Sequence, residues 1–353
     1  MRPGRVLLLA PSLRGVDGIS AVAREAASVL RSAPGADVCA WGLHDPWPGD
    51  SSARGFGGSR LAFSWRGLLQ PIRRSRFSCA LCLHLHLAPV AAPMAVSGTR
   101  LFVYLHGIEA WEPLTSLRRA ALGVPGVRFL ANSSHTLQRF QRANPGLCGP
   151  GSATVCEPGI ANAIAPDPLP ADLEPGFVLA VGRMDEGYKG HDELLEVWPG
   201  LLCNHPEARL VIAGDGQHRA RLESKARSLG LGPVVRFLGR VSEPQLEALY
   251  RGCAFFAMPS RGEGFGLVYA EAMRAGKACL AGPGGPAEVV QHEVTGLIVD
   301  PTQRSALEAA LSRLCGDVAT RERWGQAGRR RQQARFTREA FSTRLLGALG
   351  VGT

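Results

Sequence analysis

The segment Ala254–Gly276, AFFAMPSRGEGFGLVYAEAMRAG, carries the two patterns that decide the fold. It opens with AFFAMPS, an unbroken apolar run typical of a parallel strand that is covered on both faces. A glycine-rich turn follows, and we expect a helix to begin near Phe265 or Gly266. Strand, turn and helix in this order are the unit of an α/β fold.

The same alternation runs through the rest of the chain. In the first half we expect strands at 5–11, 36–43, 79–86, 100–107 and 127–133, and helices at 21–33, 88–97, 113–123 and 133–144. The proline-rich stretch 165–176 is expected to be a linker. After it we expect strands at 177–183, 208–216, 234–240, 254–260 and 278–283, and helices at 191–206, 218–230, 242–253, 265–276 and 286–292. The pattern predicts an α/β protein with two Rossmann-like domains facing a central cleft.

Length and composition agree with two globular domains. The chain has 353 residues, of which 45% are hydrophobic and 20% charged, which is enough for two separate cores. Its nine cysteines are odd in number and scattered, which indicates reduced thiols and a cytoplasmic protein. The apolar run after the N-terminus is too short for a signal peptide, and no run of eighteen apolar residues suggests a membrane span.

The positive charge is concentrated in the first half. Residues 1–165 hold 17 Arg, no Lys and 8 acidic residues, a net +9, whereas the remainder is close to neutral. The clusters QPIRRSRF (70–77) and SLRRAALG (116–123) suit an anionic membrane surface or acceptor, but a solvated arginine-rich surface explains them as well. Nucleic acid is disfavoured, because no interleaved aromatic residues or binding signature accompany the charge.

Two carboxylates flank the glycine-rich turn. Glu263 and Glu271 lie eight residues apart, beside glycines that let a ligand approach the backbone and a helix start that favours an anion. A phosphate alone would repel carboxylates, whereas sugar hydroxyls donate hydrogen bonds to them. The combination predicts a nucleotide sugar. The alternative is that Glu263 caps the helix and Glu271 is an exposed helical residue.

Three more loops are expected at the same edge of the second sheet, where ligands of such folds bind. The loop after strand 177–183 carries Arg183 and Lys189, two cations suited to phosphate. The next loop presents Gly214, and the one after it offers the backbone of Arg240 and Val241 to a base. All four loops therefore converge on a nucleotide.

From Val178 to Val299 the sequence resembles the nucleotide-binding half of retaining GT-B glycosyltransferases of family 4. The motifs that carry the resemblance are VGRMDEGYKGHDELLEV, ARLVIAGDG, VRFLGRVSEPQLEALY and MPSRGEGFGLVYAEAMRAGKACLAGPGGPAEVVQHEVTGLIVD. The spacing from Glu263 to Glu271 matches the family's paired glutamates. The first half agrees more loosely, through GVDGIS, LHGIEA and FLANSS.

The resemblance implies a role for each matching residue. Glu263 would contact the hydroxyls of the donor sugar and Glu271 those of the ribose, while Arg183 and Lys189 would bind the diphosphate. His106 matches the histidine near the sugar at the reaction centre. The further donor contacts would come from Gly18 in the glycine-rich loop of the first half and from the backbone of Gly264, Phe265, Gly266, Leu267 and Val268.

The implied reaction is retaining transfer of a sugar from a nucleotide-diphosphate sugar to a saccharide or lipid-linked acceptor, in polysaccharide or glycolipid synthesis. The sequence contains no DxD triplet, so we expect no metal and no other cofactor. Asp17 stands where the family has a second glycine, which leaves the fit of that loop open. Two alternatives also stay open: a GT-B phosphorylase or sugar-phosphate synthase, and a nucleotide-sugar-binding protein without turnover.

The resemblance also implies a domain plan. We expect an acceptor-side domain at 1–168 and a nucleotide-sugar-binding domain at 169–335. A C-terminal helix at about 336–353, with Phe336, Phe341, Leu345 and Leu346 as apolar anchors, is expected to return to the first domain. The expected location is the cytoplasm, including the inner face of the membrane.

Overall fold

The computed structural model describes residues 5–46, 52–69, 77–185 and 187–351. Contacts divide the chain into two compact units. Unit 1 comprises Met1–Ala161 and Phe336–Thr353, and unit 2 comprises Asn162–Arg335. The C-terminal segment therefore folds with the N-terminal part of the chain, and the basic cluster at 70–77 lies, except for Phe77, outside the described residues.

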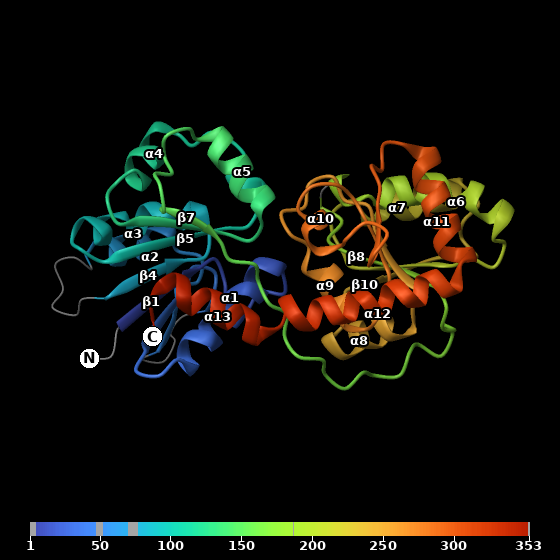
Figure 1. Ribbon diagram of the computed structural model, residues 1–353, viewed down its shortest axis with the longest axis horizontal. Coiled ribbons are helices and arrows are strands. Elements are labelled where there is room, and N and C mark those ends of the chain that lie inside the picture. The colour runs from blue at the N-terminus through green and yellow to red at the C-terminus, as the bar shows by residue number, and fades with distance from the viewer. Residues whose placement is uncertain (1–4, 47–51, 70–76, 186, 352–353) are drawn as a thin grey trace. The chain divides into compact units, whose positions relative to one another are not determined.

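In the described residues of unit 1, seven parallel strands form one sheet in the order β3-β2-β1-β4-β5-β6-β7. These strands are β1 (Arg5–Ala10), β2 (Asp37–Gly42), β3 (Ala53–Gly55), β4 (Cys79–Cys82), β5 (Arg100–Leu105), β6 (Val127–Ala131) and β7 (Ala153–Val155). Helices lie on both faces of the sheet (Figure 1). They are α1 (Gly18–Ser32), α2 (Arg60–Leu68), α3 (Ala88–Val96), α4 (Ser116–Leu122), α5 (Ser134–Ala143) and α13 (Arg338–Leu349).

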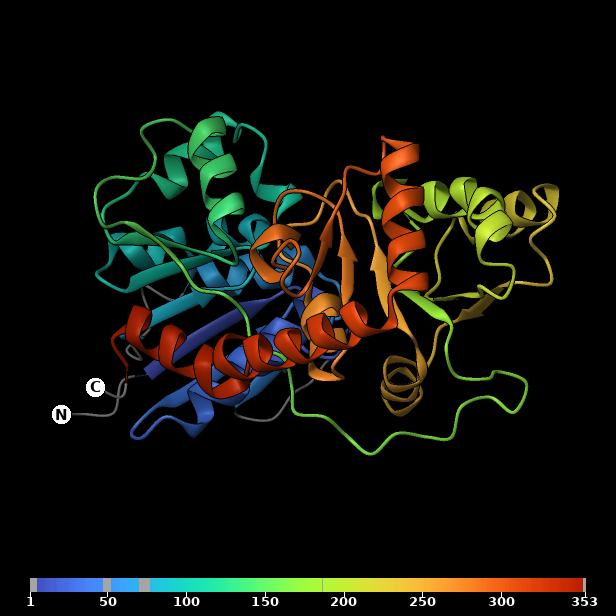
Figure 2. The same cartoon turned by 45° about the vertical axis from the view of Figure 1, so that its right-hand side comes forward.

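In the described residues of unit 2, six parallel strands have the order β10-β9-β8-β11-β12-β13. They are β8 (Val178–Val181), β9 (Leu210–Ala213), β10 (Val235–Gly239), β11 (Phe255–Met258), β12 (Cys279–Ala281) and β13 (Gly296–Ile298). Helices again cover both faces, as the turned view of Figure 2 also shows. They are α6 (His191–Asn204), α7 (Arg219–Ser228), α8 (Glu243–Gly252), α9 (Leu267–Arg274), α10 (Pro286–Val289), α11 (Arg304–Gly316) and α12 (Val318–Arg335).

Each sheet has a switch point, where the strand order reverses. In unit 1 the chain leaves β1 toward β2 and β3 and then places β4 on the other side of β1. In unit 2 it leaves β8 toward β9 and β10 and then places β11 on the other side of β8. Ligands of open α/β sheets bind beyond the carboxyl ends of the strands at such a point. In unit 2 the loops after β8 and β11 flank it.

The strand expected at 79–86 is shorter than its apolar pattern suggests. β4 ends at Cys82, and Leu85–Leu87 form a short 3-10 helix, η2. His84 and His86 therefore do not lie on a strand, although the apolar pattern of 79–86 predicts one. The hydrogen bond from the His86 N–H to His84 Nδ1, 3.2 Å long, shows the reason, since the imidazole caps this turn.

The proline-rich stretch 165–176 packs against unit 2 rather than forming a free linker. The N–H of Asp167 donates to the carbonyl of Pro244 at the start of α8, and the N–H of Gly176 donates to Gly252 at its end. Leu173 is buried. These contacts attach the stretch to the rest of unit 2, although it contains no helix or strand.

The C-terminal helix α13 packs on α1 of unit 1. Phe341, Leu345 and Leu349 are fully buried, as is Phe336 just before the helix, while Leu346 is half-buried. Arg338 at the start of α13 hydrogen-bonds to Ser28 of α1, and Arg344 donates to the carbonyl of Glu157. Within the described residues, no helix has the length and apolar character needed to cross a bilayer.

Candidate functional site

The glycine-rich turn after β11 ends in a left-handed glycine. Gly266 is the N-cap of α9 with φ 90°, and a Cβ there would lie 2.5 Å from the ring of Tyr269. α9 thus begins at Leu267, slightly later than the sequence pattern suggests. In the described part of the chain the N–H groups of Leu267 and Val268 have no hydrogen-bond partner, as expected for the first residues of a helix. The turn therefore presents free donors suited to an anion.

Lys189 and Glu263 meet across the switch point of unit 2. The Nζ of Lys189, in the short helix η4 (Gly187–Lys189) after β8, forms an ion pair with Oε2 of Glu263 in the turn after β11. The two side chains are only 13% and 20% exposed. The cation expected to bind phosphate and the carboxylate expected to bind a sugar are thus direct neighbours.

Backbone and side-chain contacts hold these two loops together. The N–H of Arg261 donates to the carbonyl of Tyr188 over 2.8 Å, and the Arg261 guanidinium pairs with Glu193 of α6 at 3.0 Å. Gly190 has φ 87°, and a Cβ there would lie 2.5 Å from the carbonyl oxygen of Pro259. Only a glycine permits this close approach.

Arg183 lies at the start of the same loop but makes weaker contacts. Its side chain is 59% exposed, and Nη1 is 3.9 Å from Oδ2 of Asp185. The next acidic residue along the chain, Glu186, lies outside the described residues. Arg183 is therefore a cation accessible to a ligand, whereas Lys189 is already paired.

Glu271 is the fifth residue of α9, and its side chain accepts a hydrogen bond from a tyrosine of α8. The hydroxyl of Tyr250 donates to Oε2 of Glu271 over 2.8 Å. Burial raises the pKa of Glu271, although the hydrogen bond from Tyr250 and the charge of Arg274 lower it. The reading of Glu271 as an exposed helical residue is wrong, because its carboxylate is half-buried and hydrogen-bonded.

The loops after β9 and β10 lie side by side at the same edge. The N–H of Gly214 donates to the carbonyl of Gly239 over 2.8 Å. Arg240 is largely exposed, with Nε 4.0 Å from Oδ2 of Asp215, and Val241 next to it is half-buried. Unit 2 thus gathers on one sheet edge all four loops singled out in its sequence.

In unit 1, Gly18 is the first residue of α1, directly after β1 and its loop. The preceding Asp17 is the N-cap, and its carboxylate accepts hydrogen bonds from the N–H of Ser20 at 3.0 Å and from the Ser20 hydroxyl at 2.8 Å. Burial opposes ionisation of Asp17, but these hydrogen bonds outweigh it and lower its pKa. The aspartate in place of a second glycine therefore has a structural role as a cap.

His106 follows β5 at the carboxyl edge of the unit 1 sheet. The ring Nε2 of His106 is 3.0 Å from the carbonyl of Leu83, and the backbone N–H of His106 donates to Oε1 of Glu109 over 2.6 Å. A carbonyl can only accept, so Nε2 carries the proton and Nδ1 is left as an acceptor. Burial lowers the pKa of His106, which keeps the ring neutral.

Comparison with known proteins identifies the family. The glycosyl transferases group 1 pattern matches residues 163–331. A GDP-mannose-dependent alpha-(1-6)-phosphatidylinositol monomannoside mannosyltransferase of Mycobacterium tuberculosis is 32% identical over 285 residues, covering 73% of this chain and 72% of that protein. The chain belongs to the glycosyl transferases group 1 family. It is a GT-B glycosyltransferase, as its motifs suggested.

Solved structures agree on the fold of this glycosyltransferase. Sucrose-phosphate synthase from Thermosynechococcus elongatus is 20% identical, with a TM-score of 0.78 and 96% of each chain covered. HepE from Anabaena, in complex with UDP and glucose, is 18% identical, with a TM-score of 0.76, and covers 98% of this chain and 99% of its own. At these identities the likeness establishes the fold alone.

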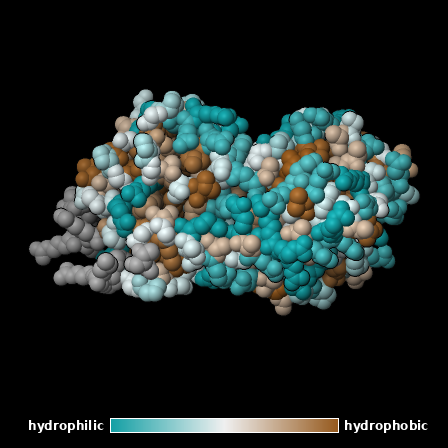
Figure 3. Space-filling view, viewed as in Figure 1, coloured by the Kyte–Doolittle hydropathy of each residue, from teal (hydrophilic) through white to brown (hydrophobic). Residues whose placement is uncertain are grey.

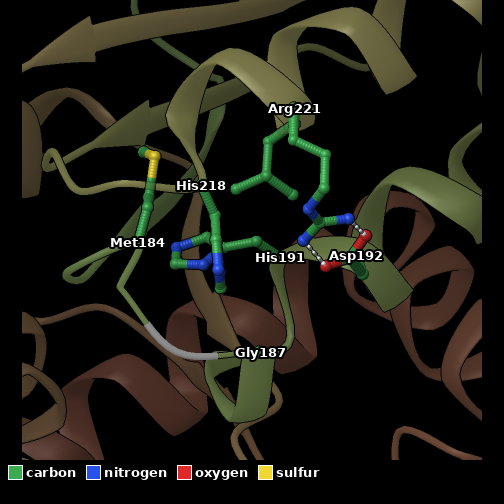
Figure 4. A pocket seen from close by; sticks show the side chains of 7 residues that line it. Met184, Gly187, His191, Asp192, His218 and Arg221 are labelled. Carbon is green, nitrogen blue, oxygen red and sulfur yellow. Dashed lines mark hydrogen bonds and ion pairs between the residues drawn. The ribbon is translucent and has the colours of Figure 1, made fainter.

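A hollow lies beside the Lys189 loop of the glycosyltransferase (Figure 4). The pair Arg221–Asp192 forms one side, with two hydrogen bonds of 2.8 and 2.6 Å. His191 lines it too, and burial followed by the charge of Lys189 lowers the pKa of His191 to about 4. Neither Glu263 nor Glu271 lines this hollow.

The sequence reasoning missed Tyr250, the hydrogen-bond donor to Glu271. The two residues are on different helices, 21 positions apart. The signal available was a tyrosine in the last turn of a helix beside Ala248 and Leu249, which packing alone would explain. Spacing within one motif does not reveal a contact between two helices.

Proposed function

We propose that this glycosyltransferase takes mannose from GDP-mannose and transfers it, with retention of configuration and without a metal, to a lipid-linked or saccharide acceptor. The observation that carries the proposal is the ion pair between Lys189 and Glu263 at the unit 2 switch point, beside free helix amides. The mannosyltransferase relative supports the choice of donor, because the match extends over most of both chains.

The donor diphosphate would be bound without a metal by cations and amides. Arg183 has an exposed guanidinium, Lys189 lies next to the turn, and the N–H groups of Leu267 and Val268 have no partner in the described residues. These groups can stabilise charge that develops on the leaving phosphate. Gly264, Phe265 and Gly266 bring the backbone of the turn close to the donor sugar.

The two glutamates would bind hydroxyls rather than attack carbon. Glu271, with one oxygen held by Tyr250, would accept from the ribose, and Glu263 from the donor sugar. Gly214 and the backbone of Arg240 and Val241 would border the base. The departing phosphate would take the proton of the acceptor hydroxyl on the same face of the sugar, so that retention needs no covalent enzyme intermediate.

Unit 1 would contribute contacts to the transferred sugar and the diphosphate. His106 presents Nδ1 as a hydrogen-bond acceptor, because Nε2 is committed to the carbonyl of Leu83. Its neutral ring suits a sugar hydroxyl better than a phosphate. Gly18 would let the diphosphate approach the start of α1 closely, since it has no side chain.

A thermal-shift screen tests the donor. We expect GDP and GDP-mannose to raise the melting temperature with and without EDTA, because a ligand that binds only the folded chain stabilises it by mass action. UDP, dTDP and ADP should give smaller shifts. A larger shift with UDP would reassign the base, and a shift abolished by EDTA would contradict metal-free binding.

Product analysis tests the reaction. Incubation with GDP-mannose and phosphatidylinositol-type or saccharide acceptors should give an α-linked mannosyl product, detected by the anomeric coupling in NMR. A β-linked product would contradict retention. Release of mannose 1-phosphate that depends on inorganic phosphate would indicate a phosphorylase instead, and binding without any turnover would support a non-catalytic protein.

We also propose that unit 1 docks on an anionic membrane from the cytoplasmic side. Leu61, Trp65 and Leu68 form one stripe of α2 and are 86%, 67% and 49% exposed. Arg60, on the same helix, and Arg118 of α4 both lie close enough to His86 to lower its pKa, after burial, which is the larger cause. Basic residues beside an apolar stripe suit anionic lipid.

Leu61, Trp65 and Leu68 are exposed hydrophobic residues gathered on one helix. On the face drawn in Figure 3, polar residues predominate and hydrophobic ones are mostly scattered. Sedimentation with phosphatidylcholine vesicles, with and without about 30 mol% of the anionic lipid phosphatidylglycerol, tests the docking. We expect binding only to the anionic vesicles and its loss in a Leu61→Ser/Trp65→Ser variant. Equal sedimentation of both proteins would contradict it.

A further inference from the structure

Glu271 depends on a helix that carries none of the proposed ligand contacts. α8 reaches α9 through two buried side chains, Tyr250 and Glu247, which are 1% and 3% exposed. Tyr250 donates to Oε2 of Glu271 over 2.8 Å. In the described residues Oε1 of Glu271 accepts no hydrogen bond. One oxygen is therefore fixed, and the other is left for a ligand.

Glu247 acts on the cation closest to Glu271 along α9. Arg274 is three residues after Glu271, which places the two on one side of the helix, where they attract each other. Instead of pairing with Glu271, Arg274 donates through Nη2 to Oε2 of Glu247 over 2.6 Å. The other oxygen of Glu247 accepts from Arg251 over 2.9 Å. Both oxygens of Glu247 are thus occupied by arginines.

We propose that Tyr250 and Glu247 are positioning residues for recognition of the donor ribose: Tyr250 fixes the Glu271 carboxylate, and Glu247 keeps Arg274 from neutralising it. The inference rests on the proposed role of Glu271 and deepens it. A carboxylate with one fixed and one unpartnered oxygen is ready to accept from a ribose hydroxyl without reorganising. Without Glu247, Arg274 would pair with the same carboxylate.

The cost of burying charge supports this function over a purely structural one. A buried ion pair is weak evidence for stability, because desolvation offsets its attraction. Here Glu247, Arg274 and Glu271 lie with the hydroxyl of Tyr250 at a place where apolar residues would pack without that cost. The arrangement leaves one carboxylate oxygen unpartnered, which a structural network would satisfy.

The test compares GDP with 2′,3′-dideoxy-GDP by isothermal titration calorimetry. We expect the wild-type chain to prefer GDP, and Tyr250→Phe and Glu247→Gln each to reduce this preference roughly tenfold through weaker GDP binding. Affinity for the dideoxy compound should change little. In a Glu271→Gln background, Tyr250→Phe should have no further effect on the ratio of the two affinities.

Tyr269→Phe is the matched control. Tyr269 is fully buried like Tyr250, but its hydroxyl donates to the carbonyl of Met258 instead of to Glu271. Loss of this hydroxyl should lower the melting temperature and leave the affinity ratio as in the wild type. If Tyr250→Phe behaves in the same way, Tyr250 has only a structural role and the inference is overturned.

The outcomes separate the inference from the function on which it rests. A wild-type chain that does not distinguish GDP from its dideoxy analogue overturns both the ribose role of Glu271 and this inference. A preference that Glu271→Gln removes and Tyr250→Phe and Glu247→Gln both retain overturns the inference alone. Loss of preference in all three variants supports it.

Discussion

Lys189 and Glu263 form a largely buried ion pair that joins the loop after β8 to the turn after β11. The sequence assigned one to the diphosphate and the other to the donor sugar, as if each were free. In the structure each neutralises the other. If these residues bind the donor as proposed, we expect a nucleotide sugar to share the Lys189 ammonium with Glu263.

Replacing Lys189 should harm binding in two ways. Lys189→Ala removes a cation and leaves the Glu263 carboxylate unpaired next to the phosphates, so we expect GDP affinity to fall on the order of 100-fold. The double variant Lys189→Ala/Glu263→Ala should recover part of that loss, since the repulsion is gone, while turnover stays low. Calorimetry measures both affinities. A double variant that binds as weakly as Lys189→Ala would contradict the coupling.

The two glutamates should separate in kinetics. Glu271→Ala is expected to weaken GDP binding with a smaller effect on the rate at saturation, because the ribose does not react. Glu263→Ala is expected to leave GDP affinity closer to that of the wild type and to lower kcat, because its partner is the sugar that changes in the transition state. Steady-state assays and GDP titrations of both variants check this, and equal behaviour of the two would count against the assignment.

The sequence predicted the strand–loop–helix order and the four loops of unit 2 because both depend on local patterns. Apolar runs and glycines mark where strands end, and ligand loops follow strands. It failed where a contact depends on the packing of distant segments. The Tyr250–Glu271 hydrogen bond joins two helices, and the cap made by His84 ends a strand that its apolar pattern would continue.

Two other differences have similar physical causes. α2 was not expected, because its residues Arg60–Leu68 expose Leu61, Trp65 and Leu68 and so do not show a simple buried stripe. The proline-rich stretch 165–176 has the composition of a linker, yet it is held by backbone hydrogen bonds to both ends of α8. Composition does not reveal such contacts.

Acidification should protonate Glu271. This should weaken nucleotide binding and, at the same time, stabilise the folded state. Burial raises the pKa of Glu271, as do the charges of Glu243 and Glu247, against the lowering by Tyr250 and Arg274. The carboxylate should therefore protonate at a higher pH than an exposed glutamate, whose ordinary pKa is about 4.3. Once protonated, it should bind ribose more weakly. A raised folded-state pKa stabilises the chain at low pH, and this contribution is lost as pH rises.

Glu271→Gln separates these two effects. The variant should bind GDP more weakly at neutral pH, and its melting temperature should equal or exceed that of the wild type there, because a buried charge is gone. GDP affinity should be measured from about pH 7 down to about pH 4.5, which is close to the ordinary glutamate pKa. As the pH is lowered, the affinity should fall more steeply for the wild type than for Glu271→Gln. Titration of the phosphate affects both proteins alike and cancels in the comparison.

Gly214 should be intolerant of any side chain. It has φ 137°, and a Cβ there would lie 2.0 Å from the carbonyl oxygen of Gly182, so the loops after β8 and β9 would have to move apart. We expect Gly214→Ala to destabilise the chain on the order of 2–4 kcal/mol and to weaken GDP binding, because the Gly182 loop leads to Arg183 and Lys189. Gly232→Ala is the control, since a Cβ there meets nothing within 4 Å. Denaturant unfolding of both variants measures the difference, and a Gly214→Ala chain as stable as Gly232→Ala would show that this loop contact is not needed to hold the edge of the sheet.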